Sequence, residues 1–254
     1  MATYKKRGYK PKTKAEKQDH IEDESTTAEV FSTLDEGASR TEAWVEKNQK
    51  PILILVVAVA VGVLGYLGFQ QFIQEPKETE AMNEMFQAQS YYEQALAATS
   101  KDSLFTLSLE GGNGKFGFVE IIENYGGTNA ANLANYYAGI AYLNTGNYQE
   151  AISHLDDFKA DDETVAPLAK GAIGDAFAQL DQFEDALKYY ESAVAISTSE
   201  VTTPRFLLKA GITALNLGKT DAALKHFKAI TENYPKSPEA SKATIYEGKA
   251  EAMQ

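Results

Sequence analysis

The sequence predicts an all-α protein, in which a single transmembrane helix is followed by an α-solenoid of paired helices. The first observation behind this is the apolar run at residues 52–69, which contains no charge. The second is a repeat: a glycine is followed twelve residues later by an alanine in three similar segments, Gly139–Ala151, Gly174–Ala186 and Gly211–Ala223. These glycines lie 35 and 37 residues apart. Such a near-constant period is typical of stacked helical repeats.

Charge and composition narrow the classes of function. Residues 76–254 hold 14 Lys and Arg against 25 Asp and Glu, a net charge of −11. This acidic balance argues against nucleic acid as a partner, because phosphate neutralisation needs a basic face. The chain has no cysteine. That excludes disulfides, thiolate chemistry and cysteine-ligated metals.

The N-terminal tail, residues 1–38, is predicted to be a disordered cytoplasmic segment. Its first 20 residues hold seven Lys and Arg against two acids, and acidic residues dominate the stretch that follows. Low hydrophobicity combined with such charge blocks is typical of disorder. The basic block either contacts anionic lipid or ribosomal RNA, or serves only as a topology signal. Ser39-Arg-Thr-Glu42 reads as a capping box that opens an interfacial amphipathic helix at residues 39–50.

Residues 51–73 are predicted to form the transmembrane helix. At ~1.5 Å of rise per residue, this segment is long enough to cross a hydrocarbon core of ~30 Å. It begins too far into the chain for a cleavable signal peptide. Lys and Arg are more frequent before the span than just after it. The positive-inside rule therefore places the N-terminus in the cytoplasm and the repeats in the periplasm, on the far side of the inner membrane.

One face of the span consists of small residues. Ala58, Gly62 and Gly65 fall at i, i+4 and i+7. Such a face allows a second transmembrane helix to approach closely. The alternative is that glycine and alanine are simply common in membrane spans, and the sequence leaves both interpretations open.

After the span, the sequence divides into helical units. Residues 76–131 are predicted to form a degenerate first repeat that carries an irregular insertion at residues 100–114. Three regular repeats occupy residues 132–237, each with two amphipathic helices and a tight turn. Residues 238–254 are predicted to form a cap helix, which repeat arrays need for solubility.

The repeats resemble the tetratricopeptide repeat in several fixed positions of each copy, notably the small residues Gly139 and Ala151 where two helices would cross. By this resemblance, the units cover residues 132–166, 167–203 and 204–237. Members of the family usually bind extended peptides or helices in a groove made by the first helix of each unit.

The resemblance implies a set of groove residues. They are mainly apolar, with amides toward one end: Leu133, Tyr136, Ile140, Leu143, Asn144, Asp175, Gln179, Arg205, Leu208, Ile212, Leu215 and Asn216. For the leucines and isoleucines, a place in the core is an equally good interpretation.

Candidate catalytic residues are lacking. The histidines, His20, His154 and His226, are too widely separated to suggest a metal site. The acidic residues at 156–163 lack the ligand spacing of a calcium loop, and 111–114 lacks the Lys-Ser/Thr of a phosphate loop. We therefore expect no enzyme activity, no cofactor and no bound metal.

The plan of charged tail, one span and repeats resembles the YfgM-like ancillary subunits of the bacterial Sec translocon. The segment from Thr41 to Pro51 and the pair Tyr91-Tyr92 add to the likeness. This resemblance implies as partners the Sec channel subunits, a membrane-anchored periplasmic chaperone of the peptidyl-prolyl isomerase type, emerging secretory proteins and membrane lipid. Two other classes remain open, an envelope-assembly scaffold and a cytochrome c maturation adaptor.

Overall fold

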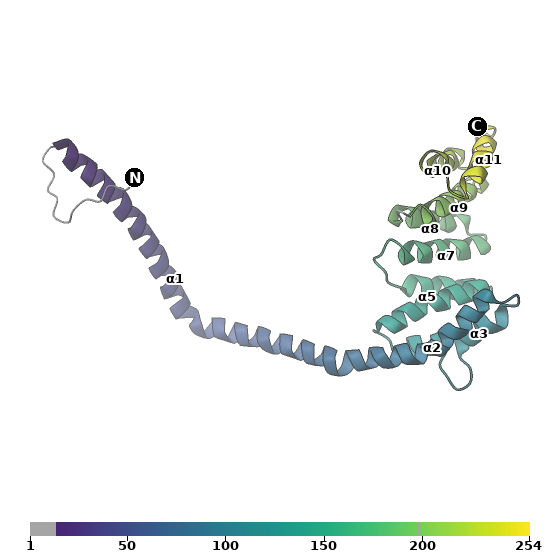
Figure 1. Cartoon of the computed structure of the whole chain (residues 1–254), viewed down its shortest axis with the longest axis horizontal. Coiled ribbons are helices and arrows are strands. Elements are labelled where there is room, and N and C mark those ends of the chain that lie inside the picture. The colour runs from purple at the N-terminus through teal and green to yellow at the C-terminus, as the bar shows by residue number, and fades with distance from the viewer. Residues whose placement is uncertain (1–13, 198) are drawn as a thin grey trace. The chain divides into compact units, whose positions relative to one another are not determined.

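The computed structural model describes residues 14–197 and 199–254, with side chains from residue 42 onward. In this part of the chain every regular element is a helix. The chain divides into two compact units, residues 1–69 and residues 70–254. Figure 1 shows the helices of the second unit following one another in chain order from α2 to α11.

Helix α1, Lys14–Phe69, contains the apolar run. An 18-residue window of this helix has a mean hydropathy of 2.7, and none of the window is buried. By length and composition, the helix is therefore able to cross a membrane. Ala58, Gly62 and Gly65 lie within it, and a Cβ atom added at Gly62 or Gly65 would have no neighbour within 4 Å.

The N-terminal segment differs from the sequence prediction. Residues 14–38 were expected to be disordered, and they belong to helix α1. No new helix begins at Ser39, and the helix continues through Pro51. Strong helix formers at the start of the segment, Lys-Ala-Glu-Lys-Gln, account for its helical preference, which a prediction based on charge alone underestimates. Residues 1–13 of the predicted tail lie outside the described residues.

A short π-helix, Gln70–Gln74, precedes helix α2, Glu75–Ala97. One face of α2 is buried against the rest of the unit through Ala81, Met85, Ala88, Tyr92 and Ala95. The spacing of these residues, three or four apart, is that of an amphipathic helix. The opposite face leaves Phe86 71% exposed.

The first turns of α2 are attached to the loop before α5, Asn129–Asn144. The Glu78 carboxylate accepts hydrogen bonds from the backbone N–H groups of Asn129 and Ala130, at 2.6 and 2.8 Å. Lys77 Nζ donates to the Gly126 carbonyl at 3.0 Å. Since the first N–H groups of a helix have no partner within it, Glu78 supplies a cap from about fifty residues away.

The predicted irregular insertion at residues 100–114 is largely helical. Helix α3, Asp102–Glu110, buries Phe105, Ser108 and Leu109. Their spacing of three and four residues places them on one face, which explains why this segment folds as a helix. Only the glycine-rich end forms a turn, in which Gly112 and Lys115 exchange two backbone hydrogen bonds. Asn113 and Gly114 have positive φ, as a tight turn of this kind requires.

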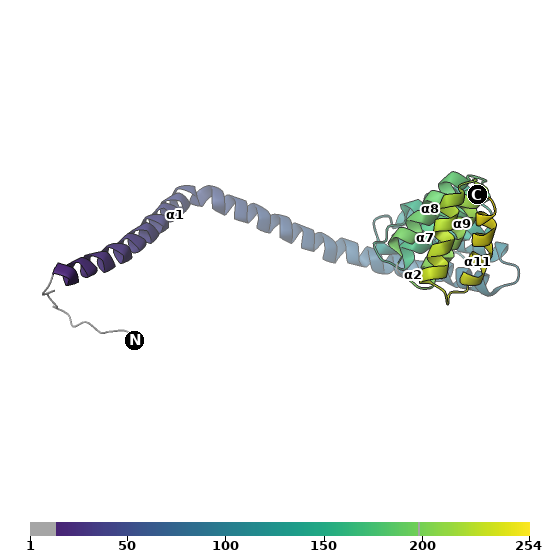
Figure 2. The ribbon, with the colours of Figure 1, turned by 90° about the horizontal axis from the view of Figure 1, so that it is seen from above.

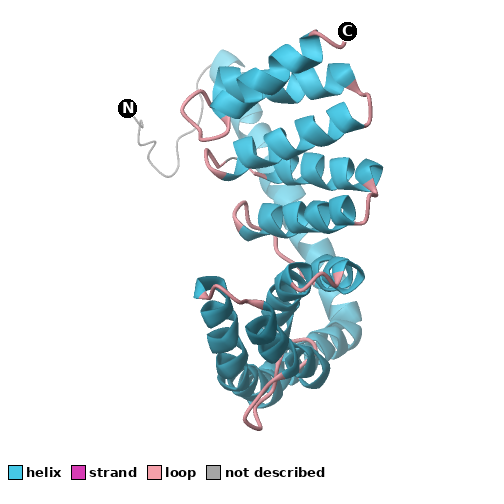
Figure 3. Cartoon of the chain, turned by 90° about the vertical axis from the view of Figure 1, so that its right-hand side faces the viewer, coloured by secondary structure: helices cyan, strands magenta, loops and turns pink. Residues whose placement is uncertain are grey.

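Helix α4, Phe118–Asn124, leads into three antiparallel helix pairs. The pairs are α5 with α6, Tyr148–Asp157; α7, Val165–Gln179, with α8, Phe183–Ile196; and α9, Thr202–Asn216, with α10, Thr220–Asn233. Helix α11, Ala240–Glu251, packs on α10 and α9. Figures 2 and 3 show the helices from α7 onward lying side by side in layers.

Small residues set the distance between the helices of each pair. A Cβ atom added at Gly139 would lie 2.4 Å from Leu155 Cγ. At Gly174 it would lie 2.6 Å from the Tyr190 ring, and at Gly211 it would lie 2.4 Å from the Phe227 ring. The repeated glycines thus lie at the helix crossings, as the sequence predicts.

Candidate functional site

The first helices of the three pairs, α5, α7 and α9, form a continuous layer. Helix α5 contacts α7, and α7 contacts α9. The second helices α8 and α10 are bridged by polar side chains instead, with His226 Nε2 lying 3.0 Å from Glu191 Oε1. We call the side of α5, α7 and α9 that carries the predicted groove residues the inner face, and it is the candidate binding surface.

The structure places the predicted groove residues at different depths. Six are partly buried: Leu133, Tyr136, Ile140, Leu143, Asp175 and Ile212. Two are buried, Leu208 and Leu215, and four are exposed, Asn144, Gln179, Arg205 and Asn216. All of the apolar ones belong to the hydrophobic clusters of the unit or pack against them. The exposed part of the inner face is therefore more polar than the sequence suggested.

Asp175 is part of an internal network and is not a free groove residue. Lys209 Nζ donates to its two carboxylate oxygens at 2.6 and 2.7 Å, and the Tyr190 hydroxyl donates to Oδ1 at 2.7 Å. Burial, and secondarily the Asp175 charge, raise the pKa of Tyr190, so that its hydroxyl stays protonated and can donate. The network joins α7, α8 and α9. The sequence could not reveal it, because its members are 15 and 34 residues apart.

Charge on the inner helices is largely paired. Helix α5 contains no charged residue. On α7, Asp175 pairs with Lys209 of α9, and Lys170 lies 3.4 Å from Asp156. Arg205, in the first turn of α9, is exposed and has no ion pair with any side chain that the structure describes.

A carboxamide ends each of the three inner helices. Asn144, Gln179 and Asn216 are the last residues of α5, α7 and α9, and all three are exposed. Asn144 Nδ2 donates to the Ile140 carbonyl at 2.8 Å. Gln179 Oε1 accepts from the Tyr148 hydroxyl at 3.4 Å, a long contact. The three amides thus form a row along one edge of the inner face.

His154 lies on the second helix of the first pair. Its ring stacks on Tyr142 at 5.3 Å, and Nδ1 is 2.9 Å from Asn135 Oδ1. Burial lowers the pKa of His154, and the nearby carboxylates of Asp157 and Glu150 oppose that effect. The histidine therefore has a packing role in this structure.

The free energy of unfolding is expected to fall in mild acid because of His154. The folded state holds its pKa below the ordinary value of 6.5. The contribution of neutral His154 to the free energy of unfolding is therefore complete above pH 6.5, and it is lost as the pH falls through the pKa of the folded state. Urea unfolding of the wild type and of His154→Gln between pH 7.5 and 5 measures this. The variant should lose less stability over that range than the wild type, and equal losses would contradict the assignment.

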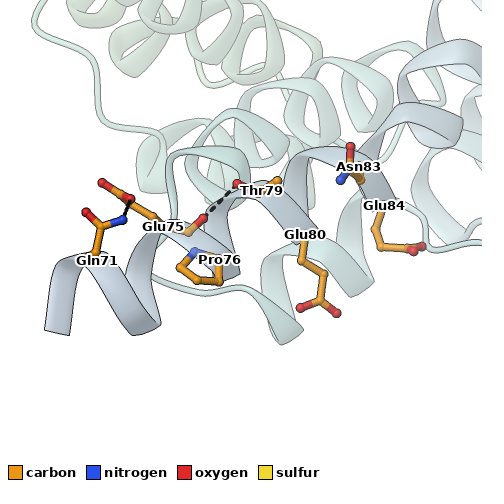
Figure 4. Close-up of a pocket in the computed structure, with 7 residues that line it drawn as sticks. All are labelled: Gln71, Glu75, Pro76, Thr79, Glu80, Asn83 and Glu84. Carbon is orange, nitrogen blue, oxygen red and sulfur yellow. Dashed lines mark hydrogen bonds between the residues drawn. The ribbon is translucent and has the colours of Figure 1, made fainter. Parts of the chain in front are cut away.

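None of the predicted groove residues lines either of two hollows in the described structure. A shallow hollow of about 590 Å³ runs along α2 and is lined by Gln71, Glu75, Pro76, Thr79, Glu80, Asn83 and Glu84. Figure 4 shows that its polar side chains are spread along the helix, with Gln71 donating to the Glu75 carboxylate. A smaller hollow of about 290 Å³ lies between the loops at residues 200–201 and 233–238. Neither has the enclosed polar centre of a small-molecule site.

Part of the chain matches a protein-family model. The family model described as T7SS, ESX-1 secretion system protein EccA1, N-terminal domain, matches residues 118–245, which is just over half of the 254-residue chain. The matched segment begins with α4 and ends within α11. It contains all three helix pairs of the candidate site. No curated protein matches the chain.

This match corrects the sequence-based assignment. The expected relationship to YfgM-like Sec subunits is wrong, and so are the expected Sec channel and isomerase-chaperone partners, because the matched family is a type VII secretion family. The envelope-assembly and cytochrome c maturation alternatives have no support either. The error arose from the tail, the span and Tyr91-Tyr92, all of which precede residue 118. General architecture is shared by unrelated secretion proteins and does not identify a family.

Proposed function

Because the chain belongs to the family of the EccA1 N-terminal domain of the ESX-1 type VII secretion system, we propose that it is a polypeptide-binding component of a secretion apparatus of this kind. The observation that carries the proposal is the coincidence of the family match with the helix pairs. The matched residues, 118–245, contain α4, the three helix pairs and the first part of α11, and they therefore include the whole inner face.

We further propose that the helix pairs are tetratricopeptide repeats, with units at residues 132–166, 167–203 and 204–237. The glycines that allow close crossing in each pair support this, together with direct contact between successive first helices. A stack of this kind presents an extended surface suited to a polypeptide. In this proposal the protein binds and does not catalyse, and the inner face contributes hydrogen-bonding and apolar contacts.

The proposal places the chain in the inner membrane as a single-pass protein, with the N-terminus in the cytoplasm and the repeats on the opposite side. The unburied apolar window of α1 supports a membrane span, and the basic residues before it support this orientation. Ala58, Gly62 and Gly65 would then face lipid or a second transmembrane helix.

Site-specific photo-crosslinking in native membranes tests the proposed function. A photoreactive amino acid replaces Gln179 on the inner face, and Lys225, exposed on α10, serves as the matched control. We expect position 179 to crosslink to secreted substrates or to components of a type VII apparatus, identified by mass spectrometry. Position 225 should yield few such products. Crosslinks at position 179 that contain no such protein would contradict the proposal.

A further inference from the structure

We propose that the inner face binds a polypeptide segment in the polyproline II conformation, and that Asn144, Gln179 and Asn216 contact its main chain. This inference rests on the proposed polypeptide binding and specifies the conformation of the ligand. The supporting observation is the row of exposed carboxamides that end α5, α7 and α9.

The hydrogen-bonding chemistry of a carboxamide matches that of a peptide group. Each has an N–H donor and a carbonyl acceptor. A helix or a paired strand has already used its main-chain groups, whereas polyproline II has no internal hydrogen bonds and leaves them unpaired. A row of carboxamides therefore suits a ligand in this conformation.

Free donors are present at all three positions. Asn144 Nδ2 uses one N–H for the Ile140 carbonyl and keeps a second. In Gln179 only the oxygen is engaged, by the Tyr148 hydroxyl. The structure gives Asn216 no hydrogen-bond partner among the described residues. Each carboxamide can thus donate to a carbonyl oxygen of the ligand.

The spacing of the helices favours polyproline II over a β-strand. Helices α5, α7 and α9 contact one another in succession, and the axes of packed helices lie ~8–10 Å apart. Polyproline II rises ~3.1 Å per residue with three residues per turn, so that equivalent carbonyls recur about every 9 Å. In a β-strand, equivalent carbonyls recur every two residues, or about 6.7 Å. Carbonyls three residues apart, which would match the helix spacing, point to opposite sides of the strand, so only one of them could face the carboxamides.

The charge pattern favours an uncharged main chain as the ligand. Helix α5 carries no charge, and Asp175 and Lys209 neutralise each other between α7 and α9. A strongly anionic ligand would need several free cations. The inner helices offer Arg205, which lies at the opposite end of α9 from the carboxamide Asn216.

The test measures peptide binding to the full-length chain in lipid nanodiscs by fluorescence anisotropy. The probe is a labelled nonaproline peptide, which is held in polyproline II and spans about 28 Å. An alternating Gly-Ser peptide of the same length is the flexible control. We expect nonaproline to bind about fivefold or more tightly than the Gly-Ser peptide, because it is already ordered.

The carboxamides are tested with the triple variant Asn144→Ala, Gln179→Ala, Asn216→Ala. It should bind nonaproline about tenfold or more weakly, since each lost hydrogen bond weakens binding severalfold. Asn216→Asp, which keeps the shape but removes the donor, should weaken binding in the same direction. The matched control is Asn233→Ala, at the end of the second helix α10, which should bind like the wild type. Helical content by circular dichroism verifies that each variant is folded.

The outcomes separate this inference from the proposed function. Binding of nonaproline by the triple variant within twofold of the wild type would overturn the role of the carboxamides. If the wild type binds a carboxymethylated unfolded protein but prefers neither peptide, the inference falls and polypeptide binding stands. If it binds none of these probes and position 179 gives no crosslinks to secretion proteins, both fall.

Discussion

Gly171→Ala is expected to lower the free energy of unfolding by about 2–3 kcal/mol, because the added methyl group has no room between α7 and the ring of Phe206. A Cβ atom at this position would lie 1.9 Å from Phe206 Cε1 and 2.1 Å from Cζ. Phe206 is 3% exposed, so its ring has little room to move. The contact joins α7 to α9, and its loss would separate the second helix pair from the third. Chemical unfolding of the full-length chain in detergent, followed by circular dichroism, measures the loss.

Two control variants test whether the contact with Phe206 causes the loss of stability in Gly171→Ala. Gly248→Ala on α11 makes the same change where a Cβ atom would have no neighbour within 4 Å, and it should stabilise the helix by up to about 1 kcal/mol. In a Phe206→Leu background, Gly171→Ala should cost less than in the wild type, since the two positions are in contact. If Gly171→Ala and Gly248→Ala have equal effects, the packing of α7 on α9 is not as described.

Contacts within a helix pair could be predicted from the sequence, and contacts between pairs could not. Gly139, Gly174 and Gly211 stand out because they recur at the same place in each copy. Gly171 has no counterpart in the other copies, and its partner Phe206 lies in the next pair. Repetition is the signal that a single sequence offers, so a contact that occurs once gives none.

The same limit applies to the binding surface. The leucines and isoleucines of the predicted groove follow the helical period, but this period does not distinguish a core face from a ligand face. The structure assigns Leu208 and Leu215 to the core. It leaves Asn144 and Asn216 exposed. A carboxamide recurs five residues after each repeated glycine, so the sequence predicts the amides at one end of the groove but not which groove side chains stay exposed.

Phe227→Ala is expected to lower the free energy of unfolding by about 3–5 kcal/mol, the largest effect that we expect from a single substitution here. Its side chain is fully buried, and its ring stacks on Tyr246 of α11 with the ring centroids 5.6 Å apart. On the other side, the ring lies against the backbone of α9 at Gly211. Truncation would therefore leave a cavity where α9, α10 and α11 meet, and the close approach at Gly211 prevents α9 from moving much nearer to fill it.

The region in which amide hydrogen exchange accelerates distinguishes local unfolding of the last helix pair from global unfolding. In a stacked array each unit contacts only its neighbours, so the last pair and its cap should open before the first pair does. Amide hydrogen exchange of Phe227→Ala should accelerate in residues 202–251 and stay near the wild-type rate in residues 129–157. Val201→Ala, at a side chain that is 65% exposed, is the control and should change neither region. Equal acceleration in both regions would mean that the unit unfolds as one cooperative body, and the helix pairs would then not be separable repeats.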